Sequence, residues 1–161
     1  MAYGEAEEYP PLWPQGFHEL SLTELEKACV SAFDLSTTRK DLMAALELVI
    51  EQLNAAGISG NIWLDGSFAT EKINPKDIDF ILVAESRVYD EGTEEQRVIL
   101  DGLTDGDLWK PPLLCDTNAA YIDPPEVQGT SNVMDYWTNR FGLSLGDRTP
   151  KGIVVIKLGE S

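Results

Sequence analysis

Residues 62–67 read IWLDGS and residues 77–84 read DIDFILVA, with a short polar segment between the two stretches. The pattern predicts a strand, a Gly-Ser turn that opens a short helix, and a second strand that begins with two carboxylates. Because side chains alternate between the two faces of a strand, Asp77 and Asp79 should point the same way and Ile78 into the core. The two strands place paired negative charges on one face of a sheet.

Paired carboxylates beside a Gly-Ser turn indicate a particular chemistry. Asp77 and Asp79 should lie about 6–7 Å apart, where like charges repel unless a cation or water compensates them. Gly66 lets the backbone approach closely, and Ser67 adds a hydroxyl to the backbone N–H groups that a helix start offers to phosphate. A divalent-metal site facing a phosphate-binding turn is typical of nucleotidyl transfer, in which two cations serve the attacking hydroxyl and the leaving pyrophosphate.

Nucleotidyl transfer also needs a third carboxylate as base, and Asp116 is the first candidate. It interrupts the apolar stretch 113–122 (LLCDTNAAYI), which reads as a strand lying beside Asp77 and Asp79 in the sheet. A buried carboxylate without a partner is costly, so Asp116 is expected to need a metal or a strong partner. Asp123 is the second choice, although turn chemistry before two prolines already explains it.

Four basic side chains are candidates for binding a triphosphate. Lys72, in the segment after Ser67, comes first, and Lys151, entering the last strand, comes second. The other two are Lys76 and Arg148. Each of the four also reads as an ordinary solvated surface charge.

The rest of the chain reads as packing elements around this centre. Residues 1–16 are an acidic, proline-rich lead-in, and 17–161 form a single domain. The Ser21–Glu24 stretch is a capping box. Arg39 and Lys40 begin a helix where the macrodipole disfavours cations, which indicates either an outside partner or plain surface charge. Further elements are predicted as helices from about 21 to 33, 38 to 56 and 93 to 103, a helix from 131, and a strand over 152–158.

Composition excludes several function classes. The net charge of −16, from 28 acidic and 12 basic residues, makes non-specific nucleic-acid binding unfavourable. It favours solubility, or as an alternative the docking of a basic partner protein. Cys29 and Cys115 have no metal-ligand spacing, and a single histidine, His18, is too few for a zinc site or a histidine-based triad. No apolar run approaches about 20 residues and no signal peptide opens the chain, so we expect a cytoplasmic protein without a membrane span.

The Gly66-Ser67 turn, nine residues, and Asp77-Ile78-Asp79 together resemble the DNA polymerase β-type nucleotidyltransferase superfamily in its minimal form. The resemblance implies an α/β (α+β) fold with a mixed, mostly antiparallel sheet flanked by helices. It implies that Asp77 and Asp79 bind Mg²⁺, two ions in all, with Asp116 as third ligand and base. Residues 14–19, 63–68, 70–72, 75 and 151–154 are also similar to a family of short bacterial and phage proteins of this superfamily whose activity is unassigned.

The resemblance implies an enzyme that moves a nucleoside monophosphate from an NTP, ATP being the first choice, to a hydroxyl on a protein, an RNA or a small molecule. Toxin, antitoxin or phage-related roles are known for minimal enzymes of this kind. Such enzymes often carry an arginine three residues after the motif serine, where this chain has Thr70, and Lys72 would take its place. The alternatives are a non-catalytic nucleotide-binding module and a protein-interaction module on the same fold.

Overall fold

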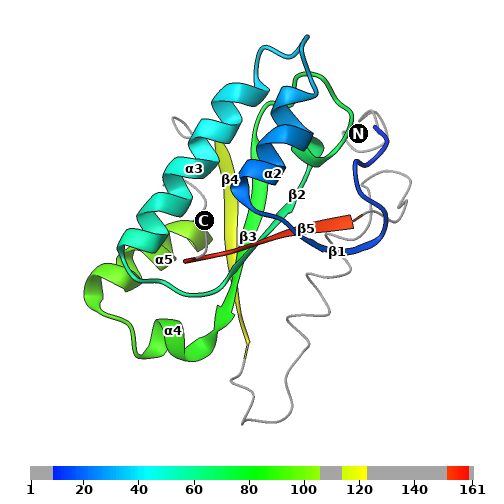
Figure 1. Ribbon diagram of the computed structural model, residues 1–161. Helices are drawn as coiled ribbons and strands as arrows, with labels where there is room; N and C mark the ends of the chain where they lie inside the picture. Colours follow the sequence, from blue (N-terminus) through cyan, green and yellow to red (C-terminus); the bar gives the residue numbers. More distant parts are fainter. Residues whose placement is uncertain (1–8, 106–113, 123–151, 160–161) are drawn as a thin grey trace, which may run out of the picture.

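A computed structural model describes residues 9–105, 114–122 and 152–159 of the chain. Its strands form one sheet in the order β1-β5-β2-β3-β4 (Figure 1). The strand bounds are Gly16–Glu19 (β1), Asn61–Asp65 (β2), Ile78–Glu85 (β3), Cys115–Ile122 (β4) and Gly152–Lys157 (β5). The helical elements are α2 (Leu22–Glu26), the π turn η1 (Lys27–Ser31), α3 (Arg39–Ala55), the 3₁₀ turn η2 (Ser67–Ala69), α4 (Ser86–Asp90) and α5 (Glu94–Asp105).

The sheet is mixed, as predicted, and helices flank it. Its four described pairings divide equally: β2 is antiparallel to β3 and to β5, whereas β3–β4 and β1–β5 are parallel. The prediction of a mostly antiparallel sheet is therefore wrong in that detail. The reason is β1, a four-residue strand that the sequence pattern does not reveal, since GFHE alternates only briefly. It begins at Gly16, the last residue of the predicted lead-in.

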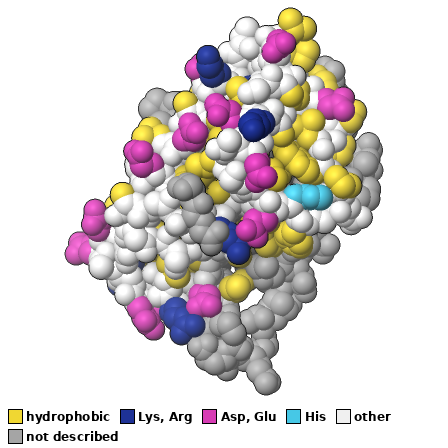
Figure 2. Space-filling view, in the orientation of Figure 1, with side chains coloured by type: hydrophobic (Ala, Val, Ile, Leu, Met, Phe, Trp, Pro, Cys, Tyr) yellow, Lys and Arg dark blue, Asp and Glu magenta, His cyan; other side chains and the backbone are white. Residues whose placement is uncertain are grey.

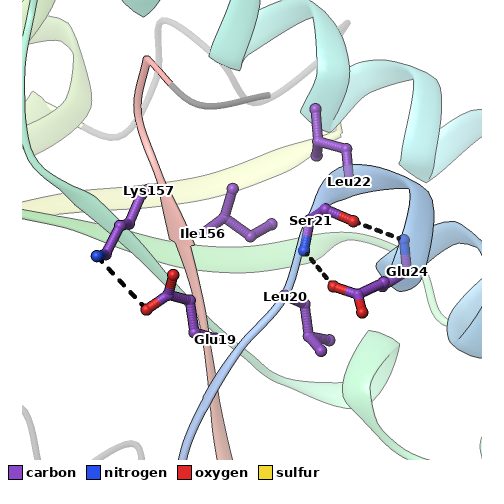
Figure 3. A pocket seen from close by; sticks show the side chains of 7 residues that line it. All are labelled: Glu19, Leu20, Ser21, Leu22, Glu24, Ile156 and Lys157. Atoms are coloured by element: carbon purple, nitrogen blue, oxygen red, sulfur yellow. Dashed lines mark hydrogen bonds and ion pairs between the residues drawn. The ribbon is translucent and has the colours of Figure 1, made fainter.

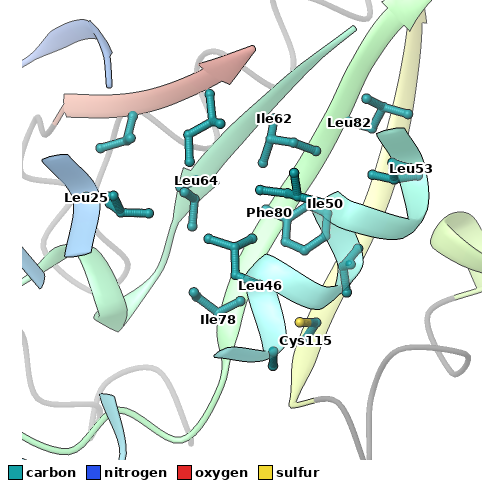
Figure 4. Close-up of a cluster of buried hydrophobic side chains, with 14 of the residues drawn as sticks. Leu25, Leu46, Ile50, Leu53, Ile62, Leu64, Ile78, Phe80, Leu82 and Cys115 are labelled. Atoms are coloured by element: carbon teal, nitrogen blue, oxygen red, sulfur yellow. The ribbon is translucent and has the colours of Figure 1, made fainter. Parts of the chain in front are cut away.

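The main core lies between α3 and one face of the sheet (Figure 4). The predicted helix over about 38–56 is confirmed, and its apolar stripe meets the strands. Each fully buried aliphatic or aromatic side chain stabilises the fold by roughly 1.5–3 kcal/mol, so this layer fixes the start of β3 against α3. The side chains at its centre are no more than 2% exposed: Leu46, Ile50 and Leu53 of α3, with Ile62, Leu64, Ile78, Phe80 and Leu82 of the strands.

The predicted capping box at the start of α2 is confirmed. The Glu24 N–H donates to Ser21 Oγ at 3.1 Å, and the Ser21 N–H donates to Glu24 Oε1 at 2.9 Å. The helix was expected to continue to about Phe33, but its second half is the π turn η1. A carbonyl of this turn, that of Cys29, accepts a hydrogen bond from Arg39 on α3. The turn is thus shaped by a contact that helical periodicity does not encode.

The second half of the lead-in is attached to the body of the protein. Pro11 forms an isolated bridge with Thr70, and the Leu12 N–H donates to the Ala69 carbonyl at 3.0 Å. Residues 10–12 therefore brace the segment that follows the Gly-Ser turn.

Other predictions have separate outcomes. The helix predicted over about 93–103 is confirmed as α5, whereas α4 has no counterpart among the predicted elements. The helix predicted from residue 131 lies outside the described residues. No helix in the described part of the chain is long and apolar enough to cross a membrane.

Candidate functional site

The two carboxylates that open β3 lie as the alternation pattern predicts. Ile78 is fully buried in the main core, whereas Asp77 and Asp79 are half-buried on the opposite side. The second face of the sheet carries its own small apolar cluster, which includes Trp63 and Ile81. Since Asp79 precedes Ile81 by two residues, the carboxylates stand at the end of this second face, away from α3.

Asp116 lies directly beside this pair, and its predicted place in the sheet is confirmed. Strand β4 runs parallel to β3, with Asp116 in register with Asp79. One carboxylate oxygen from each of Asp77, Asp79 and Asp116 lies within 4.8 Å of the others. In the described residues this is the one such group of potential metal ligands, and we call it the carboxylate triad.

The expectation that Asp116 is buried is wrong. Its residue is exposed, because β4 lies at the edge of the described sheet and Asp116 is the second residue of that strand. A burial penalty therefore does not explain its presence. What singles out Asp116 is its register with Asp79, which brings three like charges together.

The negative charges of the triad raise the pKa of a neighbouring thiol. The pKa of the Cys115 thiol is raised to about 12, first by burial and then by the charges of Asp77 and Asp79. Three carboxylates this close repel one another in the absence of a counter-charge. An all-carboxylate set of hard oxygen donors suits Mg²⁺ or Mn²⁺ rather than zinc or copper, so the residues present fit the ion that the sequence predicts.

Gly66 touches the triad directly. Its φ of +81° lies in the left-handed region, and a Cβ at this position would collide with Oδ2 of Asp79. Close approach was predicted for a phosphate, but the group that approaches Gly66 in the structure is the carboxylate. The glycine is therefore required by the packing of the turn against β3 as well as by its backbone conformation.

The short helix predicted after the turn is reduced to η2, three residues of 3₁₀ geometry. Ser67 is its first residue and not its cap: Gly66 holds the cap position, with no side-chain hydrogen bond. The Ser67 carbonyl accepts from the backbone N–H of Thr70 at 3.1 Å and from its hydroxyl at 2.8 Å. A tight turn replaces the expected helix start, and any anion must be bound by individual amides.

Most amides in this turn are already used. The N–H groups of Ala69 and Glu71 donate to the carbonyls of Gly66 and Pro10, and that of Lys72 donates to the Thr70 hydroxyl at 3.2 Å. With the Thr70 amide also engaged, a phosphate at this turn would have to use the amides and hydroxyl of residues 66–68. We call residues 66–72 the Gly-Ser loop.

The predicted basic residues are only partly placed near the loop. The ammonium group of Lys72 lies 5.6 Å from the centroid of the Tyr9 ring, in a cation–π contact with the lead-in. Lys151 lies outside the described residues, and so does the alternative Arg148. Lys76 is exposed and lies four residues after Lys72, directly before Asp77.

Arg39 is the residue that the sequence interpretation missed. It was expected to meet an outside partner or to be surface charge, but it is fully buried and its guanidinium reaches behind the Gly-Ser loop. Its ring neighbours are Phe33, whose centroid is 3.7 Å from Cζ, and Phe68, at 5.2 Å. Burial lowers the pKa of the Arg39 guanidinium below its ordinary value. Its unfavourable position at a helix start was the available sign of a tertiary role.

A separate pocket of about 200 Å³ lies at the other end of the sheet (Figure 3). Glu19 and Lys157 form an ion pair of 3.6 Å at its mouth, beside the capping-box residue Glu24. Lys157 is in register with Asn61, and Asn61 with Val83, so this pocket lies several residues along the strands from the triad. It is not part of the candidate site.

Acidic side chains do not gather in one patch on the face of the molecule that Figure 2 shows. On the face that carries α2 and α3, acidic side chains are scattered among apolar and a few basic ones (Figure 2). The carboxylate triad differs from them because its oxygens converge on a single point.

A family model described as a family of unknown function (DUF6932) matches residues 5–157. No curated protein and no solved structure matches the chain significantly.

Proposed function

We propose that the protein, which belongs to the DUF6932 family of unknown function, is an Mg²⁺-dependent nucleotidyltransferase. It would move a nucleoside monophosphate from an NTP, ATP first, to a hydroxyl on a protein, an RNA or a small molecule. The observation that carries the proposal is the convergence of Asp77, Asp79 and Asp116 within 4.8 Å beside the Gly-Ser loop.

Each carboxylate has a role in this proposal. Asp77 and Asp79, half-buried and fixed by β3, would hold the metal ions. Bound Mg²⁺ would supply charge neutralisation for the phosphates and a lower pKa for the acceptor hydroxyl. Asp116, the exposed member, would be the third ligand and the base that accepts the hydroxyl's proton, since an exposed carboxylate can pass that proton to water.

The Gly-Ser loop would orient the triphosphate. Its first residues touch Asp79 through Gly66, so a phosphate at the amides of 66–68 would lie next to the metal ligands. The Ser67 hydroxyl and Lys72 could add a hydrogen bond and a positive charge. Lys72 binds as a point charge and lacks the bidentate grip of arginine.

The first experiment measures thermal unfolding with Mg²⁺ and each NTP. A ligand at a hundred times its Kd should add about 2.7 kcal/mol to the free energy of unfolding. The double variant Asp77→Asn with Asp79→Asn should lose this stabilisation and, without metal, unfold at the wild-type temperature or above, because carboxylate repulsion is relieved. Marked destabilisation of the metal-free variant would instead make these residues structural.

A matched control removes the same charge elsewhere. Glu47→Gln with Glu51→Gln changes two exposed carboxylates on α3 and should leave the response to Mg²⁺ and NTP unchanged. If this control also loses the response, general electrostatics rather than the triad is responsible.

The second experiment incubates the protein with a cell lysate and NTPs labelled at the α- or γ-phosphate. Nucleotidyl transfer should label an acceptor from the α-labelled NTP only, and fractionation identifies it as protein, RNA or small molecule. Label that the protein adds from the γ-position, beyond what the lysate transfers without it, would contradict the proposed reaction. Binding without any transfer would support the non-catalytic nucleotide-binding module.

A further inference from the structure

The Gly-Ser loop is held from behind by one side chain. The guanidinium of Arg39 donates to the carbonyl oxygens of Phe68 at 2.7 Å, Thr70 at 2.6 Å and Lys72 at 2.6 Å, with a longer contact of 3.4 Å to that of Ser67. Four of the seven loop residues thus turn their carbonyls toward the same cation. Arg39 is fully buried, so these contacts are shielded from solvent.

The same guanidinium joins the loop to the helix layer. Nη1, which donates to Phe68, also donates to the Cys29 carbonyl in the π turn η1 at 2.9 Å. Nε donates to the Lys72 carbonyl at 3.1 Å. All five guanidinium N–H groups therefore have carbonyl acceptors. The Arg39 Cζ also lies 3.7 Å from the centroid of the Phe33 ring, in a cation–π contact. Arg39 of α3 thus binds both the Gly-Ser loop and the π turn η1.

These hydrogen bonds determine the direction in which peptide groups of the loop point. In a planar trans peptide, the N–H points opposite to the C=O. Because the Ser67 and Phe68 carbonyls face Arg39, the following amides point away from the helix layer. The Phe68 amide is one of those that the loop's internal hydrogen bonds do not use. Its N–H and the buried positive charge behind it both favour an anion in front of the loop.

We propose that Arg39 is a positioning residue, which fixes the Gly-Ser loop so that its Phe68 amide points toward the terminal phosphates of an NTP beside the carboxylate triad. This inference rests on the proposed function. Arg39 itself would touch neither the nucleotide nor the metal. It would act by orienting the peptide groups of the loop.

The test compares Arg39→Lys with the wild type and with Lys40→Met. Lysine keeps the charge but has three donors without a planar fork, so several loop carbonyls lose their partner. Lys40 is the exposed neighbour on the same helix and provides a matched control. Arg39→Met, which leaves the carbonyls without a cation, serves as the more severe variant.

Three quantities separate positioning from general stability: the Mg²⁺-induced shift of the unfolding temperature, the NTP concentration that gives half of the additional shift, and amide hydrogen exchange of the loop. Arg39→Lys should keep the Mg²⁺ shift, since the triad lies on β3 and β4. Its half-saturating NTP concentration should rise at least tenfold, and exchange should accelerate in the loop but not in β3. Lys40→Met should match the wild type in all three.

The outcomes distinguish this inference from the proposed function. If the wild type responds to Mg²⁺ and NTP and Arg39→Lys has the same half-saturating NTP concentration, Arg39 is not a positioning residue and the proposed function stands. If Arg39→Lys loses the Mg²⁺ shift as well, its role is general stability and the inference is overturned. A wild type that ignores every NTP contradicts the proposed function and this inference with it.

Discussion

Gly66 packs against the Asp79 carboxylate, and this contact is possible only because glycine has no side chain. The left-handed φ of Gly66 and the collision that a Cβ would make with Asp79 Oδ2 have separate physical causes, and both require glycine. Arg39 shows the opposite case: a large charged side chain is buried because backbone carbonyls replace its hydration shell. The candidate site depends on the contact of Gly66 with Asp79 and on the hydrogen bonds of Arg39.

Buried thiols make the stability sensitive to high pH. Burial raises the pKa of Cys29 from 9.0 to about 12, despite the opposing effect of nearby Arg39. Between pH 9 and 12 the folded state keeps a proton that the unfolded chain loses. Stability should therefore be fully present below pH 9 and fall above it, by about 1.4 kcal/mol per pH unit for one thiol.

Urea unfolding at a series of pH values from 8 to 11 checks this prediction. Cys29→Ala should show a shallower loss of stability above pH 9 than the wild type. A residual slope is expected from Cys115 and Tyr121, whose pKa values burial also raises to about 12. Identical slopes for wild type and variant would refute the assignment to Cys29.

Strand β1 and the turn η2 show how much an element can depend on its neighbours. Neither is long enough to be stable alone. Strand β1 is held by backbone pairing with β5, and the segment around η2 by backbone hydrogen bonds to residues 10–12 and by the Arg39 side chain. The π turn η1 is likewise in contact with Arg39 through Cys29. By contrast, α3 and β3 are strongly patterned and were predicted nearly to their ends.

The capping box of α2 is a local element with a measurable contribution. Ser21→Ala removes the acceptor of the Glu24 N–H, which should cost about 1 kcal/mol of stability. Urea unfolding at pH 7 measures the change. Thr23→Ala, an exposed substitution in the same helix, is the control and should change stability by no more than a few tenths. Equal effects of the two substitutions would mean that the cap contributes nothing.

The whole chain carries a net charge of −16, so repulsion among its negative side chains destabilises the folded state. Raising NaCl from about 10 to about 150 mM shortens the Debye length from ~30 to ~8 Å and should raise the unfolding temperature. Mg²⁺ at matched ionic strength should raise it further in the wild type but not in the Asp77→Asn, Asp79→Asn double variant. Differential scanning fluorimetry measures both effects, and an unfolding temperature that falls with NaCl would contradict the first.

Much of the candidate site could be predicted from the sequence. The faces of Asp77, Ile78 and Asp79 follow from strand alternation, and the neighbouring place of Asp116 from a second apolar strand. The expected burial of Asp116 was wrong because strand order, and hence which strand lies at the edge, is not written in the pattern of one strand. The helix after Ser67 was wrong because Arg39 and the lead-in hold that segment in a tight turn.

The sequence by itself determined the elements whose physical cause lies within a few residues: α3, β2, β3, β4 and the capping box, through periods of 3.6 and 2.0 and through local hydrogen bonds. The tertiary structure alone decided the pairing of β1 with β5, the contact of Gly66 with Asp79, and the burial of Arg39. These join segments far apart in the chain, and no local pattern records which carbonyls a distant side chain will meet.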